Sequence, residues 1–268
     1  MSLRMDDSPA DTPWWALRYE ALAAIDPALL GLGDYAAEAE LVERLLGLER
    51  GARILDVGCG LGRHAGALSL RGHQVTGADL SPRVLRLARE RWDRLFAGQP
   101  GPTWMPGDMR WLPNGGAFDA LLFLGSSFGL FETDAENQQV LVGALQHLRP
   151  GGTLVLQTPN PYWWATHTGT QYVAPGALAE RVEVVQSIRF DAQNGRVDER
   201  TICFRGGERV EPPAQSIRAY TPAELMANLR AAGFGEVEVS GSEGWEVPEE
   251  SVPVDATESV WLWVSARA

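Results

Sequence analysis

Three glycines at positions 58, 60 and 62 directly follow the apolar run Ile54-Leu55-Asp56-Val57. A glycine turn between a strand and a helix lets backbone amides approach a ligand closely and points a helix N-terminus at it. A second apolar run ends in Asp79, about 20 residues further on, which is the spacing of an acid that binds ribose hydroxyls. The pattern predicts a strand, a turn, a helix and a second strand that together bind a nucleoside.

The spacing of the glycines also separates two classes of nucleoside-binding enzyme. Dinucleotide dehydrogenases use G-x-G-x-x-G, where the third glycine allows the helix to pack closely against the strand. Here that third position is Arg63, and the glycines follow a G-x-G-x-G spacing instead. The sequence therefore disfavours an NAD-dependent oxidoreductase, which stays the alternative enzyme.

Composition predicts an unanchored chain in a reducing, cytoplasmic setting. The 268 residues are 45% hydrophobic, which is enough for one large domain with an inserted subdomain. The net charge of -12 disfavours nucleic acid and anionic membranes as partners. Cys59 and Cys203 lie far apart in sequence, and neither has a partner residue at the spacing typical of metal ligands, so no metal is predicted. Residues 1–11 are polar and acidic, unlike a signal peptide, and no apolar run is long enough to span a bilayer.

Strand and helix signals alternate through most of the chain, which favours a parallel sheet with helices on both faces. Strands are predicted at 54–57, 74–80, 103–105, 118–124, 153–157, 236–240 and 259–266, with helices at 12–48, 63–71, 82–96, 134–148 and 221–232. The continuous apolar run at 118–124 is typical of a strand buried on both faces, at the centre of the sheet.

The alternation is interrupted at 159–215, where β signals occur without intervening helices. Segments 182–190 and 197–205 flank Gln193-Asn194-Gly195, and an Asn-Gly pair between such segments favours a hairpin. The fold class is therefore α/β, a Rossmann-like doubly wound seven-stranded sheet with an inserted antiparallel β subdomain. The predicted organisation is an N-terminal helical cap at 1–50, a nucleoside-binding core at 51–158, an inserted β lid at 159–217 and the C-terminal part of the core sheet at 218–268.

Several short motifs resemble the class I S-adenosylmethionine-dependent methyltransferases, closely over residues 50–158 and more loosely at 220–225 and 232–234. The residues that carry the resemblance are Leu55-Asp56-Val57-Gly58-Cys59-Gly60-Leu61-Gly62-Arg63-His64, Thr76-Gly77-Ala78-Asp79-Leu80-Ser81, Gly107-Asp108-Met109-Arg110, Phe118-Asp119-Ala120 and Leu148-Arg149-Pro150-Gly151-Gly152. The resemblance implies S-adenosyl-L-methionine as the cofactor.

The resemblance also implies roles for individual residues. The turn from Gly58 to Gly62 would line the methionine and ribose, Asp79 would accept both ribose hydroxyls, and Asp108 with Met109 would hold the adenine. Asp56 either contacts the amino group of the cofactor or braces the loop, while Arg63 is placed to meet its carboxylate. The predicted cofactor-binding set is Asp56, Gly58, Cys59, Gly60, Gly62, Arg63, Asp79, Leu80, Asp108, Met109 and Gly125.

Methyl transfer from a sulfonium is an in-line displacement, so alignment and exclusion of water matter more than a catalytic triad. The segment after the central strand should lie beside the transferred methyl, which makes Ser127 and Phe128 candidates for the catalytic site. Residues 159–167 form a predicted loop rich in aromatics, suited to cover a small organic substrate or cation. Tyr162 and His167 are the candidates there, His167 as a base.

The leading interpretation is a methyltransferase that acts on a small molecule, with amine N-methylation favoured because an acidic protein tolerates amines. A non-catalytic S-adenosylmethionine-binding protein is the other alternative, because the acceptor side has no diagnostic residue. The N-terminal helices and the insertion are expected to set acceptor specificity. The insertion also offers a surface for a homodimer, which the sequence does not decide.

Overall fold

The computed structural model describes residues 12–30, 35–113, 117–169, 171–174, 182–242 and 252–268. The polar segment predicted at 1–11 lies outside these residues. None of the helices in the described ranges is long and apolar enough to cross a membrane.

Seven strands form the core sheet, in the order β11-β12-β5-β4-β1-β2-β3. Their bounds are β1 (Arg53–Val57), β2 (Gln74–Asp79), β3 (Thr103–Pro106), β4 (Phe118–Phe123), β5 (Leu148–Pro159), β11 (Val237–Gly241) and β12 (Trp261–Arg267). Strands β1 to β5 pair in parallel, whereas β12 is antiparallel to both β5 and β11. The doubly wound seven-stranded sheet is thus confirmed, with the predicted apolar run at its centre as β4.

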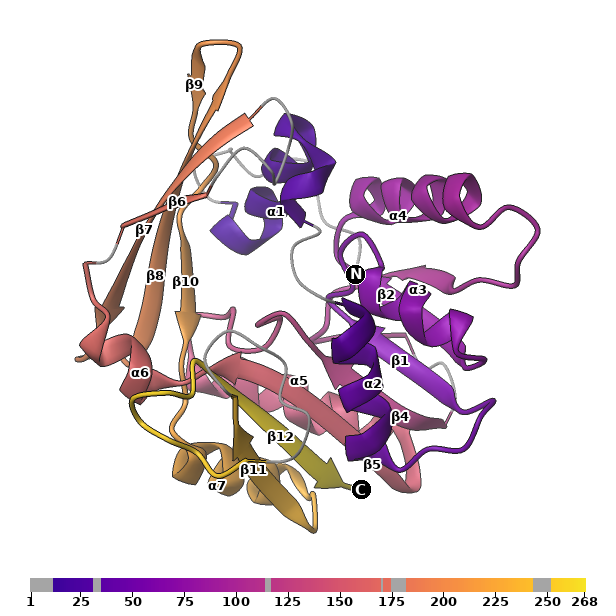
Figure 1. Ribbon diagram of the computed structural model, residues 1–268. Coiled ribbons are helices and arrows are strands. Elements are labelled where there is room, and N and C mark those ends of the chain that lie inside the picture. The colour runs from indigo at the N-terminus through magenta and orange to yellow at the C-terminus, as the bar shows by residue number, and fades with distance from the viewer. Residues whose placement is uncertain (1–11, 31–34, 114–116, 170, 175–181, 243–251) are drawn as a thin grey trace.

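Helices cover both faces of this sheet (Figure 1). Their bounds are α1 (Trp14–Ile25), α2 (Tyr35–Leu46), α3 (Arg63–Leu70), α4 (Pro82–Leu95), α5 (Asp134–His147) and α7 (Pro222–Ala232), with a short 3-10 helix η1 (Pro27–Leu30) after α1. Leu122 of β4 packs in one buried cluster with α2 and α3, and Leu121 packs in another with α5 and α7. Because neighbouring residues of β4 face opposite clusters, the strand needs apolar residues at consecutive positions.

Capping side chains set the ends of the helices that position the sheet. Ser81 Oγ accepts a hydrogen bond from Val84 N at 3.1 Å and begins α4. Thr221 and Glu224 form the capping box expected at the start of α7. A second capping box, between Thr133 and Glu136, begins α5 and was missed in the sequence.

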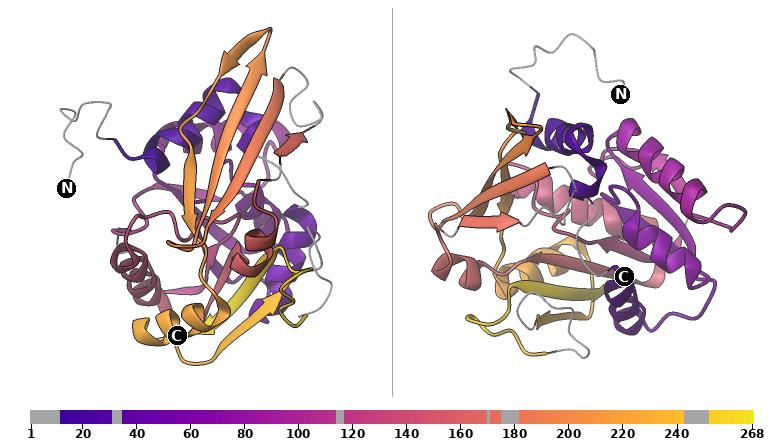
Figure 2. Two further views of the ribbon diagram at one scale, coloured as in Figure 1. Left: turned by 90° about the vertical axis from the view of Figure 1, so that its left-hand side faces the viewer. Right: turned by 45° about the horizontal axis from the view of Figure 1, so that its top comes forward.

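The insertion is a separate antiparallel sheet that stands beside the core (Figure 2). Its strands are β6 (Gln171–Ala174), β7 (Val182–Asp191), β8 (Arg196–Arg205), β9 (Glu208–Val210) and β10 (Gln215–Arg218). The main order is β10-β8-β7-β6, and β9 pairs with β8. The hairpin predicted around Asn194-Gly195 joins β7 to β8. The antiparallel subdomain is therefore present as expected.

The expectation that 159–215 holds no helix is wrong, because α6 (Pro161–Thr166) lies where a loop was predicted. Asn160 caps this helix, since its side chain accepts a hydrogen bond from Tyr162 N at 3.1 Å, and Pro161 occupies the first turn. Trp163 and Trp164 are buried in a cluster with residues of the inserted sheet. The aromatic density here packs the inserted sheet onto the core.

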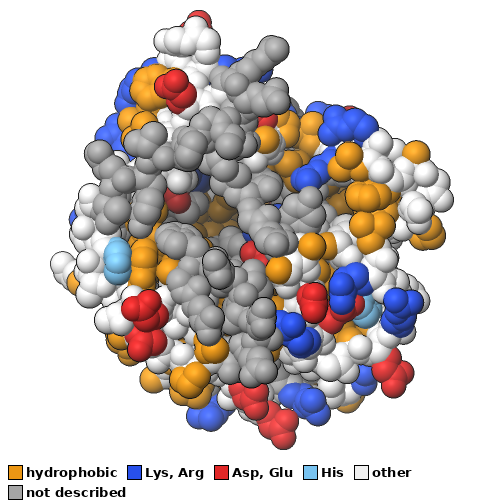
Figure 3. All heavy atoms as spheres, in the orientation of Figure 1, with side chains coloured by type: hydrophobic (Ala, Val, Ile, Leu, Met, Phe, Trp, Pro, Cys, Tyr) orange, Lys and Arg blue, Asp and Glu red, His pale blue; other side chains and the backbone are white. Residues whose placement is uncertain are grey.

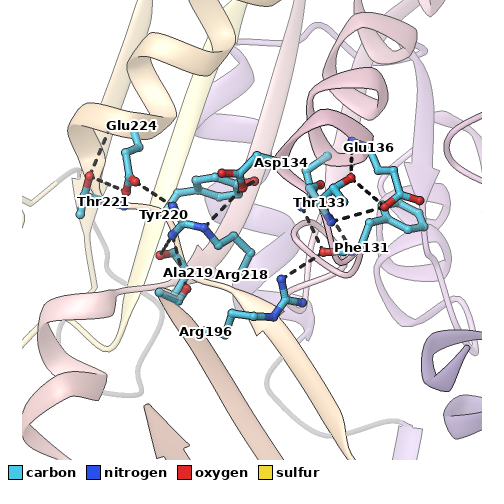
Figure 4. A network of polar contacts seen from close by, with 12 residues as sticks. Phe131, Thr133, Asp134, Glu136, Arg196, Arg218, Ala219, Tyr220, Thr221 and Glu224 are labelled. Atoms are coloured by element: carbon cyan, nitrogen blue, oxygen red, sulfur yellow. Dashed lines mark hydrogen bonds and ion pairs between the residues drawn. The ribbon is translucent and has the colours of Figure 1, made fainter. Parts of the chain in front are cut away.

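Polar contacts join the inserted sheet to the start of α5 and α7 (Figure 4). Arg218 at the end of β10 lies 2.8 Å from Glu224 and 3.4 Å from Asp134. The Tyr220 hydroxyl donates to Asp134 at 2.7 Å, and Arg196 Nη1 donates to the Phe131 carbonyl at 3.1 Å. The contacts to Asp134 and Phe131 join residues distant in sequence, so they fix β8 and β10 against the core.

Two glycines of the turn after β1 differ in what surrounds them, which gives a stability prediction. Both have positive φ, 55° at Gly60 and 69° at Gly62, but a Cβ at Gly60 would meet no atom within 4 Å. A Cβ at Gly62 would lie 2.2 Å from the Trp104 ring. We expect Gly60→Ala to lower the free energy of unfolding by about 1 kcal/mol through backbone strain, and Gly62→Ala by about 2 kcal/mol because overpacking adds to the same strain. Urea denaturation of the two variants measures this difference, and equal losses would contradict it.

Candidate functional site

A cavity of about 310 Å³ lies between the core sheet, helix α1 and the inserted sheet. In Figure 3 the surface is hollowed between the inserted sheet and the core. The turns that follow β1 and β4 both contribute to the cavity. The chain continues from β1 to one side of the sheet and from β4 to the other, so the cavity lies where ligands of doubly wound sheets bind.

The glycine turn supplies one side of this cavity. Gly58 and Gly60 line it, and a Cβ at Gly58 would lie only 2.7 Å from Ser127 Cβ, so the two loops touch here. Gly62 is not among the lining residues, because it packs against Trp104. The first two glycines thus shape the cavity, and the third shapes the packing behind it.

Asp79 lies at the end of β2 and lines the cavity beside Leu80. Its Oδ2 accepts a hydrogen bond from Gly60 N at 3.0 Å, and its Oδ1 accepts one from Ser81 N at 2.9 Å. Burial raises the pKa of the Asp79 carboxyl, while these two backbone donors oppose the shift. The carboxylate thus holds the glycine turn and keeps lone pairs for a ligand.

Asp56 and Cys59 are buried next to the glycine turn. Asp56 is not among the cavity-lining residues, and its Oδ2 has no hydrogen-bond partner among the described residues. Burial raises the pKa of Asp56, against the opposing charges of His64 and Arg63. Burial also raises the pKa of the Cys59 thiol well above its usual value, so it stays protonated at neutral pH and is a poor nucleophile.

A carboxylate from helix α2 holds the two basic residues at the start of α3. Glu38 Oε2 contacts His64 Nε2 and lies 3.8 Å from Arg63 Nη2. Both basic residues line the cavity, and a Cβ at Gly125 would lie 3.0 Å from Arg63 Nη2. A cationic group therefore lies between the turns that follow β1 and β4.

Asp108 and Met109 line the cavity after β3. Arg110 Nη2 donates to Asp108 Oδ2 at 2.7 Å, and the same guanidinium lies 4.9 Å from the Trp15 ring centroid and 4.4 Å from that of Phe131. Such cation–π contacts favour a fixed arrangement. Trp15 belongs to α1, so Arg110 connects Asp108 to the N-terminal helix.

The turn after β4 is constrained at several points. Gly125 N donates to Gln157 Oε1 at 2.8 Å, and Ser127 Oγ donates to the Val57 carbonyl at 3.0 Å. Ser126 has a φ of 60° and is the one non-glycine residue with positive φ among the described residues. Such strain is held by the surrounding structure and is frequent at functional sites. Ser127 lines the cavity, as does Gly125.

The other three candidates for the catalytic site do not line the cavity. Phe128 is buried in the core, where its ring lies 5.7 Å from that of Tyr220. The Tyr162 side chain is exposed on α6. His167 stacks on Trp163 with ring centroids 3.6 Å apart, and its Nδ1 contacts the Trp163 carbonyl. These residues form parts of the core, the surface and the end of α6.

Five polar residues that line the far side of the cavity were missed in the sequence. Arg18 and Tyr19 come from α1, Gln186 from β7, Glu199 from β8 and Gln215 from β10. Burial raises the pKa of Tyr19 to about 12; Arg18 opposes this shift, and Glu199 and Asp79 add to it. One sequence signal was available: Glu199 occupies an inward position in the alternation of β8, between the buried residues at 197 and 201.

Comparison with known proteins agrees with this geometry. Residues 54–152 match the family model described as a methyltransferase domain. These residues form a methyltransferase domain. The chain is 35% identical to glycine N-methyltransferase of Rattus norvegicus over 52% of this chain and 52% of that protein. It is 30% identical to dTDP-3-amino-3,6-dideoxy-alpha-D-glucopyranose N,N-dimethyltransferase of Streptomyces fradiae over 54% and 53%. The chain thus spans about half the length of these curated relatives.

A solved structure extends the similarity of the methyltransferase domain to the rest of the chain. This is an amino pentose methyltransferase from Micromonospora echinaspora involved in calicheamicin biosynthesis, with S-adenosylmethionine bound. It shares 27% identity with a TM-score of 0.63, covering 93% of this chain and 96% of that one. The residues that line the cavity here fit S-adenosylmethionine, because Asp79 keeps lone pairs for ribose hydroxyls and open space adjoins Gly60.

Proposed function

We propose that the protein transfers a methyl group from S-adenosylmethionine to the nitrogen of a small-molecule amine. The supporting observation is one cavity in which the glycine turn faces a second set of polar residues from α1 and the inserted sheet. The overall charge of -12 is compatible with a cationic or neutral acceptor. The relatives from rat and Streptomyces fradiae are named for N-methylation, which favours nitrogen over oxygen or carbon as the acceptor atom.

In this proposal the core supplies the cofactor site. Asp79 accepts the ribose hydroxyls, and the backbone at Gly58 and Gly60 lies along the ribose and methionine. Asp108 and Met109 contact the adenine, and Arg63 meets the carboxylate of the methionine. Each of these residues lines the cavity. Helix α1 and the inserted segment 159–217 supply the acceptor side.

The bound cofactor would supply an electrophilic methyl group, so the chain has chiefly to align the acceptor and exclude water. Leu130 and Phe131 of the turn after β4, with Trp15 and Leu22 of α1, provide apolar lining for that purpose. Tyr19 stays protonated at neutral pH because its pKa is about 12, so its hydroxyl orients a ligand and does not act as a base. We therefore expect the acceptor nitrogen to react as the free amine.

Mass spectrometry tests the function directly. Purified protein with S-adenosylmethionine and a mixture of small amines should yield S-adenosylhomocysteine and an amine heavier by about 14 Da, one added CH₂. A heat-inactivated sample is the control. Thermal stabilisation by NAD and not by S-adenosylhomocysteine would contradict the proposal, and cofactor binding without any methylated product would favour a non-catalytic binding protein.

The raised pKa of Asp79 predicts a pH dependence of cofactor binding. A carboxyl whose pKa is raised protonates at a higher pH than an ordinary aspartate and then loses lone pairs for the ribose hydroxyls. Affinity for S-adenosylhomocysteine should therefore fall as the pH is lowered through that raised pKa, while Asp79→Asn should lack this step. Calorimetric titration between pH 8 and about pH 4 measures it. The same step in the variant would assign the titration to another group.

A further inference from the structure

The inner face of the inserted sheet, which faces α1 and the cavity, is mostly apolar, apart from one polar cluster and Arg205 at the end of β8, which donates to the Ile25 carbonyl. The buried apolar residues on this face are Val182, Val184, Ile188, Val197, Cys203 and Ile217. Among them lie Gln186, Glu199, Thr201 and Gln215, which we call the Glu199 cluster. Glu199 is directly opposite Gln215 in the register of β8 and β10, and Gln186 is opposite Thr201 in that of β7 and β8. Polar groups in such surroundings are costly unless they are hydrogen-bonded.

Hydrogen bonds within the cluster fix the orientation of both glutamines. Glu199 Oε1 accepts from Thr201 Oγ1 at 2.7 Å and from Gln186 Nε2 at 3.1 Å. Glu199 Oε2 accepts from Gln215 Nε2 at 3.1 Å. Because a carboxylate only accepts, each amide must turn its NH₂ group toward it. The amide carbonyl oxygens have no hydrogen-bond partner in the described part of the chain, and both glutamines line the cavity.

Arg18 is the cation that contacts the Glu199 cluster, and it donates hydrogen bonds to groups within the protein. Arg18 Nη2 donates to Glu199 and to Thr201, the latter at 2.7 Å, and Nη1 donates to the Pro213 carbonyl at 2.7 Å. Its Nε is buried, and the whole residue is 2% exposed. Arg18 thus balances Glu199 and offers no accessible donor to a ligand. The acceptors that remain are two amide carbonyls and one carboxylate oxygen with spare lone pairs, beside the second N–H of each amide.

We propose, on the basis of the proposed N-methylation, that the Glu199 cluster binds the hydroxyl groups of a polyhydroxylated amine. The two carbonyl oxygens and Glu199 Oε2 can accept hydrogen bonds from hydroxyl groups. Together these oxygens have enough spare lone pairs for more than one hydroxyl. An acceptor whose far end is a carboxylate would meet the two carbonyl oxygens and the Glu199 carboxylate here, which disfavour a second negative charge. The cavity therefore selects amino sugars or amino polyols over amino acids, including glycine.

Calorimetry on the S-adenosylhomocysteine-saturated protein tests this with three amines, D-glucosamine, cyclohexylamine and glycine. We expect D-glucosamine to bind at least tenfold more tightly than the other two. Gln186→Leu and Gln215→Leu should each weaken D-glucosamine binding roughly tenfold, about the worth of one hydrogen bond. Neither should weaken cyclohexylamine, and both should still bind S-adenosylhomocysteine. Gln193→Leu, an exposed glutamine in the turn between β7 and β8, is the matched control.

The outcomes separate the two proposals. If D-glucosamine binds no better than cyclohexylamine, or if glycine binds best, the hydroxyl subsite is wrong while the methyltransferase proposal stands. Equal affinities for D-glucosamine in Gln215→Leu, Gln186→Leu and Gln193→Leu would also overturn the subsite. Failure of the native protein to bind S-adenosylhomocysteine would overturn both proposals.

Discussion

Asp79→Asn should weaken binding of S-adenosylhomocysteine about 100-fold while leaving the chain folded. The substitution removes a charged acceptor from the ribose hydroxyls, and a hydrogen bond to a charged group contributes about 1.5–3 kcal/mol. At 1.4 kcal/mol for each factor of ten, the upper part of that range gives roughly 100-fold. Asparagine can still accept from Ser81 N through its Oδ1, but it loses the acceptor of the Gly60 N–H bond. Calorimetric titration gives the affinity, and urea denaturation reports the fold.

Asp191 provides the matched control for Asp79. Its carboxylate also accepts backbone hydrogen bonds, from Gln193 N at 3.0 Å and Asn194 N at 3.3 Å, but it lies in the hairpin turn outside the cavity. Asp191→Asn should therefore leave cofactor affinity within about twofold of the native protein, well under 1 kcal/mol. Equal losses of cofactor affinity in Asp79→Asn and Asp191→Asn would contradict a role for Asp79 in cofactor binding.

The side of the cavity where we propose that the cofactor binds is formed by residues that could be singled out from the sequence, because their signals are local. Each parallel strand ends at the same edge of the sheet, so the residues that follow β1, β2 and β3 meet there. Gly60, Asp79, Asp108 and Met109 accordingly all line the cavity. Gly62 satisfied the same motif but faces Trp104, since an alternating spacing does not say which glycine contacts a ligand and which relieves a packing contact.

The proposed acceptor side could not be predicted in the same way, because its residues come from four elements far apart in the chain. Aromatic density favoured the segment with Tyr162 and His167, yet Asn160-Pro161 is a helix-start signal, and the helix buries its tryptophans against the inserted sheet. Glu199 carries no motif. Its position becomes informative only when the register of β8 shows a carboxylate on an apolar face.

Helix α1 connects the two sides of the cavity. Trp15 and Arg18 are three residues apart, so they lie on the same face of the helix. Trp15 stacks against the Arg110 guanidinium that is paired with Asp108, while Arg18 is paired with Glu199 of the inserted sheet. The helix therefore contacts a predicted cofactor residue and the proposed acceptor subsite at once, which makes its docking a requirement for both.

Arg18→Met should lower the free energy of unfolding by about 3–5 kcal/mol, because it leaves the Glu199 carboxylate uncompensated. The side chains of Arg18 and Glu199 are only 3% and 13% exposed. Removing both charges with Arg18→Met/Glu199→Leu should restore most of this loss, since apolar residues of similar volume often replace a buried pair without cost. Urea denaturation of the single and double variants gives the three values.

The double variant also separates stability from recognition. It should bind S-adenosylhomocysteine like the native protein and lose the preference for D-glucosamine over cyclohexylamine, because the glutamines no longer have a carboxylate to orient them. The matched control is the Arg189–Asp198 pair of the same sheet, whose side chains are 66% and 29% exposed. Arg189→Met should cost no more than about 1 kcal/mol. A similar loss in Arg18→Met and Arg189→Met would mean that Glu199 is solvated in the cavity and needs no counter-ion from α1.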